Sequence, residues 1–162
     1  MAAVPGVLDF DGFFRAEYPK LVAIGSAMTG DHDTACELAQ EALVRCLRNW
    51  ARVSTMDVPG AWARRVLINL AIDAHRARGR ARRVAARTRI EEAAGFDDPV
   101  IDGWWTAVRA LPDRQRAAVV LHYVEDRPVH EVASILGIAE GTVKASLAKA
   151  RTTLARALEK EG

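Results

Sequence analysis

The stretch that decides the fold is residues 129–154, VHEVASILGIAEGTVKASLAKARTTL. Its first half repeats apolar residues at i, i+3, i+4 and i+7, the spacing of one helix face. Gly137 then suits a left-handed helix end, and a second apolar stripe follows it at Val143, Leu147, Ala150 and Leu154. We therefore predict two helices, over residues 129–136 and 140–158, joined by a short turn.

The opposite face of the second helix is polar and basic. Its candidate DNA-contacting residues are Glu140, Gly141, Thr142, Lys144, Ser146, Lys149 and Arg151. A helix, a glycine turn and a polar helix form a helix-turn-helix, whose second (recognition) helix enters the major groove with its first turn nearest the bases. A plain helical hairpin with solvated lysines is the alternative.

The remaining periodic segments are also helical, and alternating strand patterns are absent. We predict an all-α protein of two small domains joined by a linker. The expected helices outside the motif cover residues 10–28, 31–50, 61–78, 103–110 and 112–124, with Trp62, Val66 and Leu70 facing the core in the third. The expected domains are 8–78 and 101–162, and the linker is 79–100, helical in part.

Charge is segregated along the chain although the net charge is only +2. Residues 76–89 contain seven arginines and no acid, whereas residues 31–41 contain four acids and no lysine or arginine. Such a chain can offer one surface to phosphates and another to a different partner. A solvated linker is the alternative for the arginine run.

The sequence favours a reduced, cytoplasmic protein. Cys36 and Cys46 would lie about 15 Å apart on one helix, too far for a disulfide. The apolar stretch 21–28 is short for a signal peptide, and no run approaches a membrane span. His32 and Cys36 lack a second ligand pair, and no catalytic grouping stands out. We expect no metal, no cofactor and no enzymatic activity.

Three stretches resemble the extracytoplasmic-function (ECF) RNA polymerase sigma factors of the sigma-70 family. Residues 111–117 (LPDRQRA), 131–144 (EVASILGIAEGTVK) and 149–151 (KAR) resemble region four. Residues 33–41 (DTACELAQE) resemble the polymerase-docking helix of region two, and residues 59–76 (PGAWARRVLINLAIDAHR) resemble its promoter-melting and −10-reading segment. The small size and the MTGD step at 28–31 resemble the SigE-like actinobacterial subgroup.

The resemblance implies a sigma factor that binds the β′ clamp of core RNA polymerase and directs it to promoters through −10 and −35 elements. An anti-sigma factor is an open further partner, and no membrane is involved. The competing hypothesis is a stand-alone helix-turn-helix regulator, which needs neither the acidic first half nor the helix that carries Asn69 and Asp73.

The resemblance assigns polymerase binding to Asp33, Glu37, Gln40, Glu41 and Arg45. A solvated face with an i,i+4 pair between Glu41 and Arg45 is the alternative.

The resemblance assigns −10 DNA binding to Trp62, Arg64, Arg65, Asn69, Asp73 and Arg76. The loop at 53–60 would capture an unstacked base, with Trp62 as a wall. The alternatives are that Trp62 is simply core and that Asn69 and Asp73 bond each other.

Two departures from the family pattern affect the −35 preference. Ala139 stands where a capping Ser is common, and Ala145-Ser146 stands where Ser-Arg is common. A lost cap costs about 1 kcal/mol.

Overall fold

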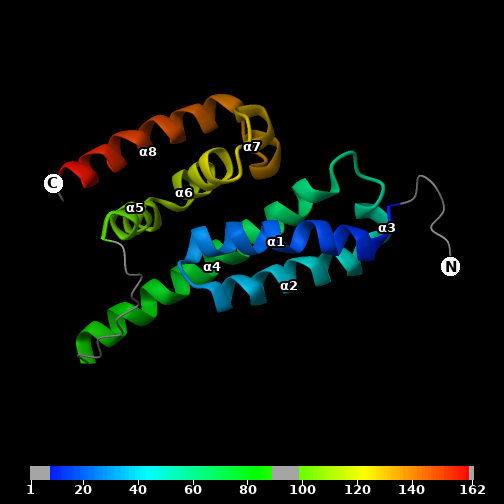
Figure 1. Cartoon of the computed structure of the whole chain (residues 1–162), viewed down its shortest axis with the longest axis horizontal. Coiled ribbons are helices and arrows are strands. Elements are labelled where there is room, and N and C mark those ends of the chain that lie inside the picture. The colour runs from blue at the N-terminus through cyan, green and yellow to red at the C-terminus, as the bar shows by residue number, and fades with distance from the viewer. Residues whose placement is uncertain (1–7, 89–98, 161–162) are drawn as a thin grey trace.

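The computed structural model describes residues 8–88 and 99–160, and all regular structure in these ranges is helical. The first part, here the N-terminal unit (residues 8–88), contains α1 (Phe10–Thr29), α2 (His32–Arg48), α3 (Trp50–Val53) and α4 (Pro59–Thr88). The second part, here the C-terminal unit (residues 99–160), contains α5 (Pro99–Ala110), α6 (Asp113–Val119), a π-helical turn η1 (Val120–Val124), α7 (Val129–Leu136) and α8 (Glu140–Lys160). The predicted all-α fold is confirmed (Figure 1).

Local capping explains the boundary between α1 and α2. Gly30, at φ +75°, ends α1, and its N–H donates to Ser26 O at 2.8 Å. Asp31 then caps α2 by accepting a hydrogen bond from the Thr34 N–H at 3.2 Å. The stop and the cap place the helix break at residues 30 and 31, close to the break expected between helices at 10–28 and 31–50.

Helix α4 is longer than predicted. It begins at Pro59, a residue suited to the first helical turn, and runs ten residues past the expected end at 78. Its 30 residues span about 45 Å. The arginines of residues 76–88 therefore extend along a helix that projects beyond its neighbours, and the first half of the expected linker is helical (Figure 1).

Helices α7 and α8 form the predicted helix-turn-helix. Gly137, at φ +67°, ends α7 in the left-handed conformation. Val143, Leu147, Ala150 and Leu154 of α8 are all buried, as the apolar stripe predicted. The motif is therefore built as its sequence indicates.

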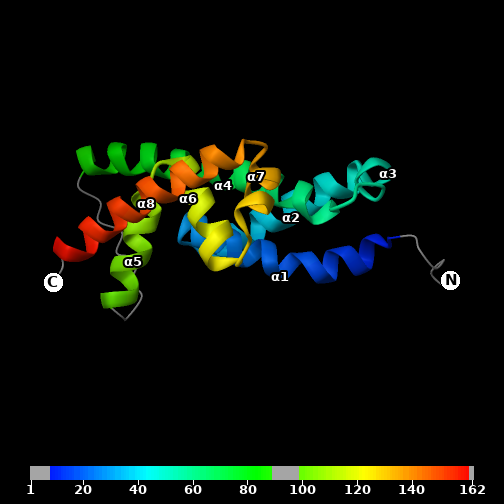
Figure 2. The same ribbon diagram turned by 90° about the horizontal axis from the view of Figure 1, so that it is seen from above.

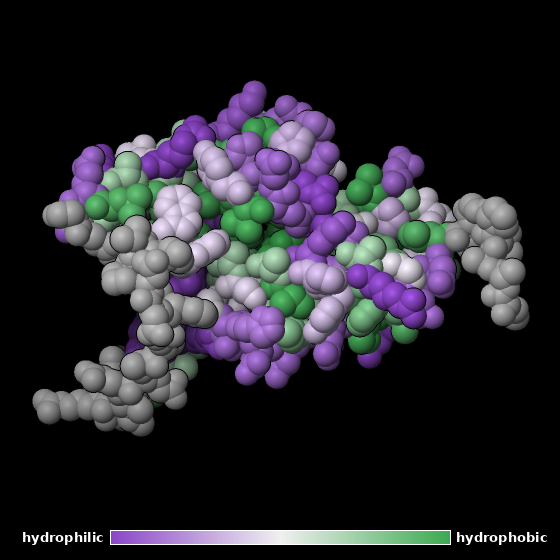
Figure 3. Space-filling model, in the orientation of Figure 1, coloured by the Kyte–Doolittle hydropathy of each residue, from purple (hydrophilic) through white to green (hydrophobic). Residues whose placement is uncertain are grey.

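The two units pack against each other. In two perpendicular views α7 lies beside the beginning of α4 (Figures 1 and 2), and α1 contacts η1 and α5. Figure 3 shows hydrophobic side chains near the middle of one face, where the units meet, with mainly hydrophilic ones around them. Within residues 8–88 and 99–160, no helix is long and apolar enough to cross a bilayer.

Candidate nucleic-acid interface

The outer face of α8 carries most of the predicted −35 residues. Glu140, Gly141, Lys144, Lys149 and Arg151 are exposed, and Thr142 is half-buried. Arg151 Nη1 donates to the Tyr123 hydroxyl at 3.1 Å, so this side chain is partly held within its own unit. The exposed lysines leave the first three turns of α8 open to a phosphate or a base edge.

The predicted place of Ser146 on the outer face of α8 is wrong, because its side chain does not lie on that face. Its exposed fraction is only 9%, and it sits on the core side of α8. Ser146 follows Val143 by three residues and precedes Ala150 by four, which places all three on one side of the helix. A DNA contact by Ser146 does not fit this placement.

Backbone groups organise the start of α8 at Ala139, where a capping serine was expected from the family pattern. The N–H groups of Thr142 and Val143 both donate to Ala139 O, at 3.0 and 3.1 Å. The first turn thus begins at the predicted residue despite the alanine.

The acidic face of α2 is accessible to a partner. Asp33, Glu37 and Gln40 are exposed, and Glu41 accepts a hydrogen bond from Arg45 at 3.0 Å. The side chains of this pair are 44% and 47% exposed, so the expected i,i+4 pair exists without closing the face.

Two apolar residues on α2 also stand exposed next to that face and were not predicted. Val44 is 39% exposed and Leu47 is 52% exposed. Both fall outside the buried stripe of Ala35, Ala39 and Leu43, and this offset from the helical period was the signal available in the sequence. An acidic face with exposed apolar residues is typical of a protein-binding surface.

On α4, Asn69 and Asp73 are exposed on one face, and no hydrogen bond between these two described residues is found. Trp62 is half-buried, with the Arg52 guanidinium 5.8 Å from its ring centroid. Trp62 is therefore not simply part of the core, and one side of its ring is occupied by a cation.

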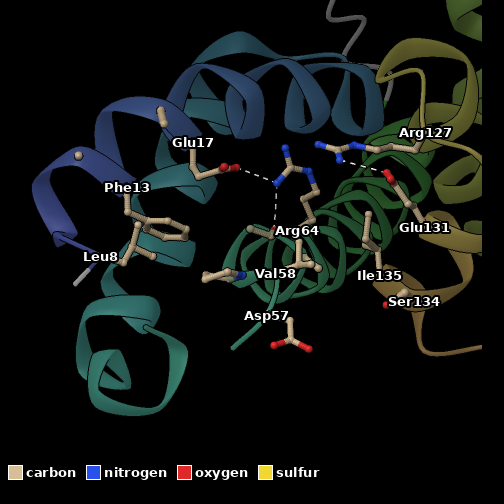
Figure 4. Close-up of a pocket in the computed structure, with 15 residues that line it drawn as sticks. Leu8, Phe13, Glu17, Asp57, Val58, Arg64, Arg127, Glu131, Ser134 and Ile135 are labelled. Atoms are coloured by element: carbon tan, nitrogen blue, oxygen red, sulfur yellow. Dashed lines mark hydrogen bonds and ion pairs between the residues drawn. The ribbon is translucent and has the colours of Figure 1, made fainter. Parts of the chain in front are cut away.

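The expected contact of Arg64 with −10 DNA does not fit the structure, since this residue is 2% exposed and lies between the two units. Its Nε donates to Glu125 Oε1 at 2.5 Å. Its Nη1 donates to Glu17 Oε2 at 2.7 Å and to Gly60 O at 3.0 Å (Figure 4). A buried guanidinium is retained only where such partners compensate its lost hydration. In this arrangement Arg64 is not available to a phosphate.

Arg65 binds the end of α7. Its Nε donates to Ile135 O and its Nη2 donates to Ser134 O, both at 2.8 Å. The last carbonyls of a helix lack intrahelical donors and carry the negative end of its dipole, so a guanidinium suits them. Gly137 permits the approach, because a Cβ there would lie 3.0 Å from Arg65 Nη2.

Arg76 is exposed and also contacts the C-terminal unit. Its Nε donates to Asp113 Oδ2 at 2.7 Å, and Asp113 Oδ1 accepts from the buried Arg116 at 2.8 Å. Burial alone would raise the pKa of Asp113, but the hydrogen bonds from Arg76 and Arg116 hold it below its ordinary value. Three arginines predicted to hold −10 DNA therefore contact the other half of the chain.

A cavity of about 430 Å³ lies between α1, the turn before α4 and α7 (Figure 4). Asp57 and Val58 of the predicted base-capturing loop line one side of it, and Phe13 of α1 lines another. Ser134 and Ile135 of α7 also line it. The loop thus borders a hollow, and the C-terminal unit contributes part of its wall.

Among the described residues, the cysteines form neither a disulfide nor part of a metal site. Cys36 and Cys46 are both free, and burial raises the pKa of the Cys46 thiol to about 11. Cys36 Sγ lies 3.5 Å from His32 Nε2. No group of three or more His, Cys, Asp or Glu side chains in residues 8–88 and 99–160 is arranged to hold a metal ion.

Comparison with known proteins extends these observations. Residues 13–81 match the family described as Sigma-70 region 2, and residues 102–154 match Sigma-70, region 4. The chain is 31% identical to an RNA polymerase sigma-E factor of Streptomyces avermitilis, over 94% of this chain and 87% of that protein. It is 29% identical to the ECF RNA polymerase sigma factor SigM of Mycobacterium tuberculosis, over 92% and 76%.

A solved structure is similar across both units. The sigma factor RpoE of Bartonella quintana, crystallised with the anti-sigma factor NepR, superposes with a TM-score of 0.73 at 25% identity. The superposition covers 93% of this chain and 97% of that one.

Proposed function

Because the chain belongs to the sigma-70 family, as an ECF RNA polymerase sigma factor of the SigE-like type, we propose how its surfaces divide the work of promoter recognition. The chain is a sigma factor that binds core RNA polymerase and directs it to promoters. The observation that carries this function is the match to region 2 and region 4, in that order, on its two helical units. A stand-alone regulator is not favoured, since residues 13–81 match region 2.

In the proposed division, residues 8–78 dock on polymerase and read the −10 element, residues 79–100 connect, and residues 101–162 read the −35 element. The β′ clamp binds the α2 face of Asp33, Glu37, Gln40, Glu41 and Arg45. The exposed side chains of Val44 and Leu47 support this assignment, because apolar area next to complementary charge stabilises protein interfaces.

For the −10 element, Asn69 and Asp73 face an opened strand from the exposed side of α4, and the 53–60 loop receives an extruded base. The cavity beside Asp57 and Val58 supports that role. Arg64 is left out of the DNA contacts, because its guanidinium is buried on two carboxylates. For the −35 element, Glu140 and Lys144 read bases and Lys149 holds phosphate.

The remaining assignments concern setting and partners. As a transcription initiation factor the chain itself catalyses no reaction, and it acts in the cytoplasm where polymerase and promoter DNA are found. An anti-sigma factor is a further proposed partner, supported by the similarity to RpoE, which was crystallised with one.

The test is co-elution of the folded chain with core RNA polymerase in gel filtration, followed by mapping of transcript starts after overexpression. We expect a stable complex at micromolar concentration and a shared −10 and −35 pattern upstream of the induced starts. Failure to co-elute, or tight palindrome binding by the free chain, would contradict the proposal.

A further inference from the structure

We propose that the last part of α4 (residues 79–88), here the arginine arm, binds the phosphates of duplex DNA through Arg80 and Arg83. The place of that duplex, on the −35 side of the opened −10 strand, rests on the proposed function, whereas the phosphate binding itself does not.

The arginine arm projects from the N-terminal unit. Helix α4 continues to Thr88, and its end extends beyond α1 and α2 (Figures 1 and 2). A Cβ added at Gly79 would meet no heavy atom within 4 Å, so no neighbouring element packs against the helix at that point. Arg80, Arg82 and Arg83 are all exposed. Their guanidinium groups are therefore open to a partner.

Arg80 and Arg83 continue the face of α4 that carries Asn69 and Asp73. Residues 69, 73, 76, 80 and 83 follow one another in steps of four and three, which keeps them on one side of a helix. All five are exposed, and the row is about 21 Å long. The face proposed to meet the opened −10 strand therefore runs on into a row of guanidinium groups.

The two arginines also lack an anionic partner within the described part of the chain. Arg76 and Arg78 are each paired with an aspartate, whereas no ion pair or hydrogen bond joins Arg80 or Arg83 to a side chain in residues 8–84 and 103–160. Residues 74–88 contain no Asp or Glu, so neighbouring guanidinium groups repel one another along the helix. A bound polyanion removes that repulsion, and the N–H donors of arginine suit phosphate oxygens.

The composition of the arginine arm favours nucleic acid over a lipid surface. A helix that lies on a membrane needs a broad apolar face, and Val84 is the one bulky apolar residue in the sequence of residues 79–88. The chain runs on from the arm to the C-terminal unit, which reads the −35 element in the proposed function. The arm is therefore placed next to the duplex that lies between the two promoter elements.

Arg82 offers a matched control on the same helix. It follows Arg78 by four residues, and Arg78 Nη2 donates to Asp31 Oδ2 at 2.7 Å and to Thr34 Oγ1 at 2.9 Å, at the start of α2. Arg82 thus lies on the α2 side of α4, away from the proposed phosphate-binding row. It has the same charge and is also exposed.

The test is binding of the full free chain to a fluorescein-labelled, mixed-sequence DNA duplex of about 30 base pairs, measured by anisotropy between about 50 and 200 mM NaCl. Each phosphate contact that is lost lowers the slope of log affinity against log salt concentration by about 0.9. We expect that loss for Arg80→Gln and for Arg83→Gln, about twice that loss for the double variant, and less than about 0.3 for Arg82→Gln. No duplex binding at the lowest salt, an unchanged slope in the double variant, or an equal loss in Arg82→Gln overturns the proposal.

A charge-conserving variant separates phosphate binding from an effect on the helix. Arginine, lysine and glutamine are all good helix formers, so circular dichroism should be unchanged in every variant. Arg80→Lys with Arg83→Lys should keep the slope, because the positive charges remain. A slope that falls as far with lysine as with glutamine assigns the effect to the helix and overturns the proposal.

Parallel titrations distinguish the sources of phosphate. The same variants are measured on a duplex RNA of equal length and on phosphatidylglycerol vesicles. We expect the double Gln variant to lose affinity for the DNA duplex. A loss confined to the RNA or to the vesicles overturns the assignment to DNA.

The position on the promoter is tested in the polymerase complex. Neutral methylphosphonates are placed one at a time between the −10 and −35 elements of a promoter found by transcript mapping. We expect some of them to weaken binding of the unchanged protein but not of the double Gln variant. A penalty that is equal in both proteins at every position overturns the placement.

The outcome is separable from that of the proposed function. Co-elution with polymerase together with equal salt slopes in the double Gln variant and Arg82→Gln rejects only the arginine arm. A slope reduced in the double Gln variant alone, without co-elution, rejects only the sigma function.

Discussion

The two helices that face DNA in the proposed function differ in whether their basic side chains are bound within the chain or exposed to solvent. On α8, Lys144 and Lys149 project into solvent. On α4, Arg64, Arg65 and Arg76 are bound to Glu125, to the end of α7 and to Asp113. The difference teaches that a basic residue on a helix proposed to bind DNA can instead bind a carboxylate or carbonyl of its own chain, so charge pattern alone does not identify its partner.

The strongest way to break this comparison is Arg64→Ala. We expect a loss of about 3–5 kcal/mol in the free energy of unfolding, because Glu17 would remain buried without its cation and Glu125 would keep only Arg127. Urea denaturation followed by circular dichroism measures it. Lys149→Ala on exposed α8 is the control and should stay within about 0.5 kcal/mol. A loss below about 1 kcal/mol for Arg64→Ala would mean that the buried ion pairs contribute little.

The same comparison shows what the sequence could predict. Helices α1, α2, α7 and α8 were located well because each has a local signal, such as the Gly30 stop, the Asp31 cap and the apolar stripe of α8. The end of α4 was missed because Gly79 and the arginine run indicated a linker. Arginine and alanine are in fact good helix formers, and the helix continues to Thr88.

The core face of α4 was also misplaced, for a tertiary reason. The apolar residues Trp62, Val66 and Leu70 were expected inside, and they are only half-buried. The fully buried stripe is Ala63, Leu67 and Ala71, with Arg64 beside it. Helices α1 and α2 pack against α4, and α7 covers a further side of it near Arg65. The local periodicity of α4 does not show which of its sides these partners cover.

The candidate site also has a part that local sequence signals predict and a part that depends on tertiary contacts. Helical periodicity predicts the exposed residues of α2 and α8, and most of them lie on the predicted outer faces, with Ser146 as the exception. The partners of Arg64 lie 47 and 61 residues away in sequence and carry no motif that links them to it. Contacts of this kind need the three-dimensional structure.

A second prediction separates base reading from phosphate holding on α8. Lys144 is exposed in its first turns, so Lys144→Ala should relax the preference at one −35 position, costing about 1–3 kcal/mol there. Arg151 lies two turns beyond Lys144 and donates to the Tyr123 hydroxyl. Arg151→Ala should therefore weaken binding to all promoters about equally and reduce the dependence of affinity on salt concentration. Initiation from a randomised −35 library, read by sequencing transcripts, measures both. A base-specific change in Arg151→Ala with none in Lys144→Ala would reverse the assignment.

A third prediction concerns the pH dependence of stability around His75. Burial and the charges of Arg116, Arg82 and Arg109 hold the pKa of His75 below its ordinary 6.5, with Asp113 opposing them. Because a depressed pKa disfavours protonated His75 in the folded protein, its contribution to stability is fully present above pH 6.5 and is lost as pH falls through the lower value.

The free energy of unfolding, measured by urea denaturation, should therefore fall between pH 7.5 and 5.5, and His75→Gln should flatten that dependence. Asp113 stays ionised over this range, since its pKa lies below its ordinary 3.8. A pH response that persists unchanged in His75→Gln would assign it to another group.

The smallest expected effect on stability concerns the α2 face, and it decides between docking and simple solvation. Glu41 and Arg45 form an exposed i,i+4 pair, so Glu41→Gln should change the free energy of unfolding by only about 0.3–0.5 kcal/mol.

If the face binds the clamp, the same substitution should weaken the polymerase complex several-fold, because interface charges act on the partner more than on the fold. Leu47→Ser should do likewise, since its side chain is 52% exposed in the free protein and would be covered in the complex. Fluorescence anisotropy with core polymerase measures both, with the exposed Glu159→Gln of α8 as the control. Unchanged affinity in Glu41→Gln and Leu47→Ser would leave the pair as an ordinary solvated contact and move the docking surface elsewhere on the N-terminal unit.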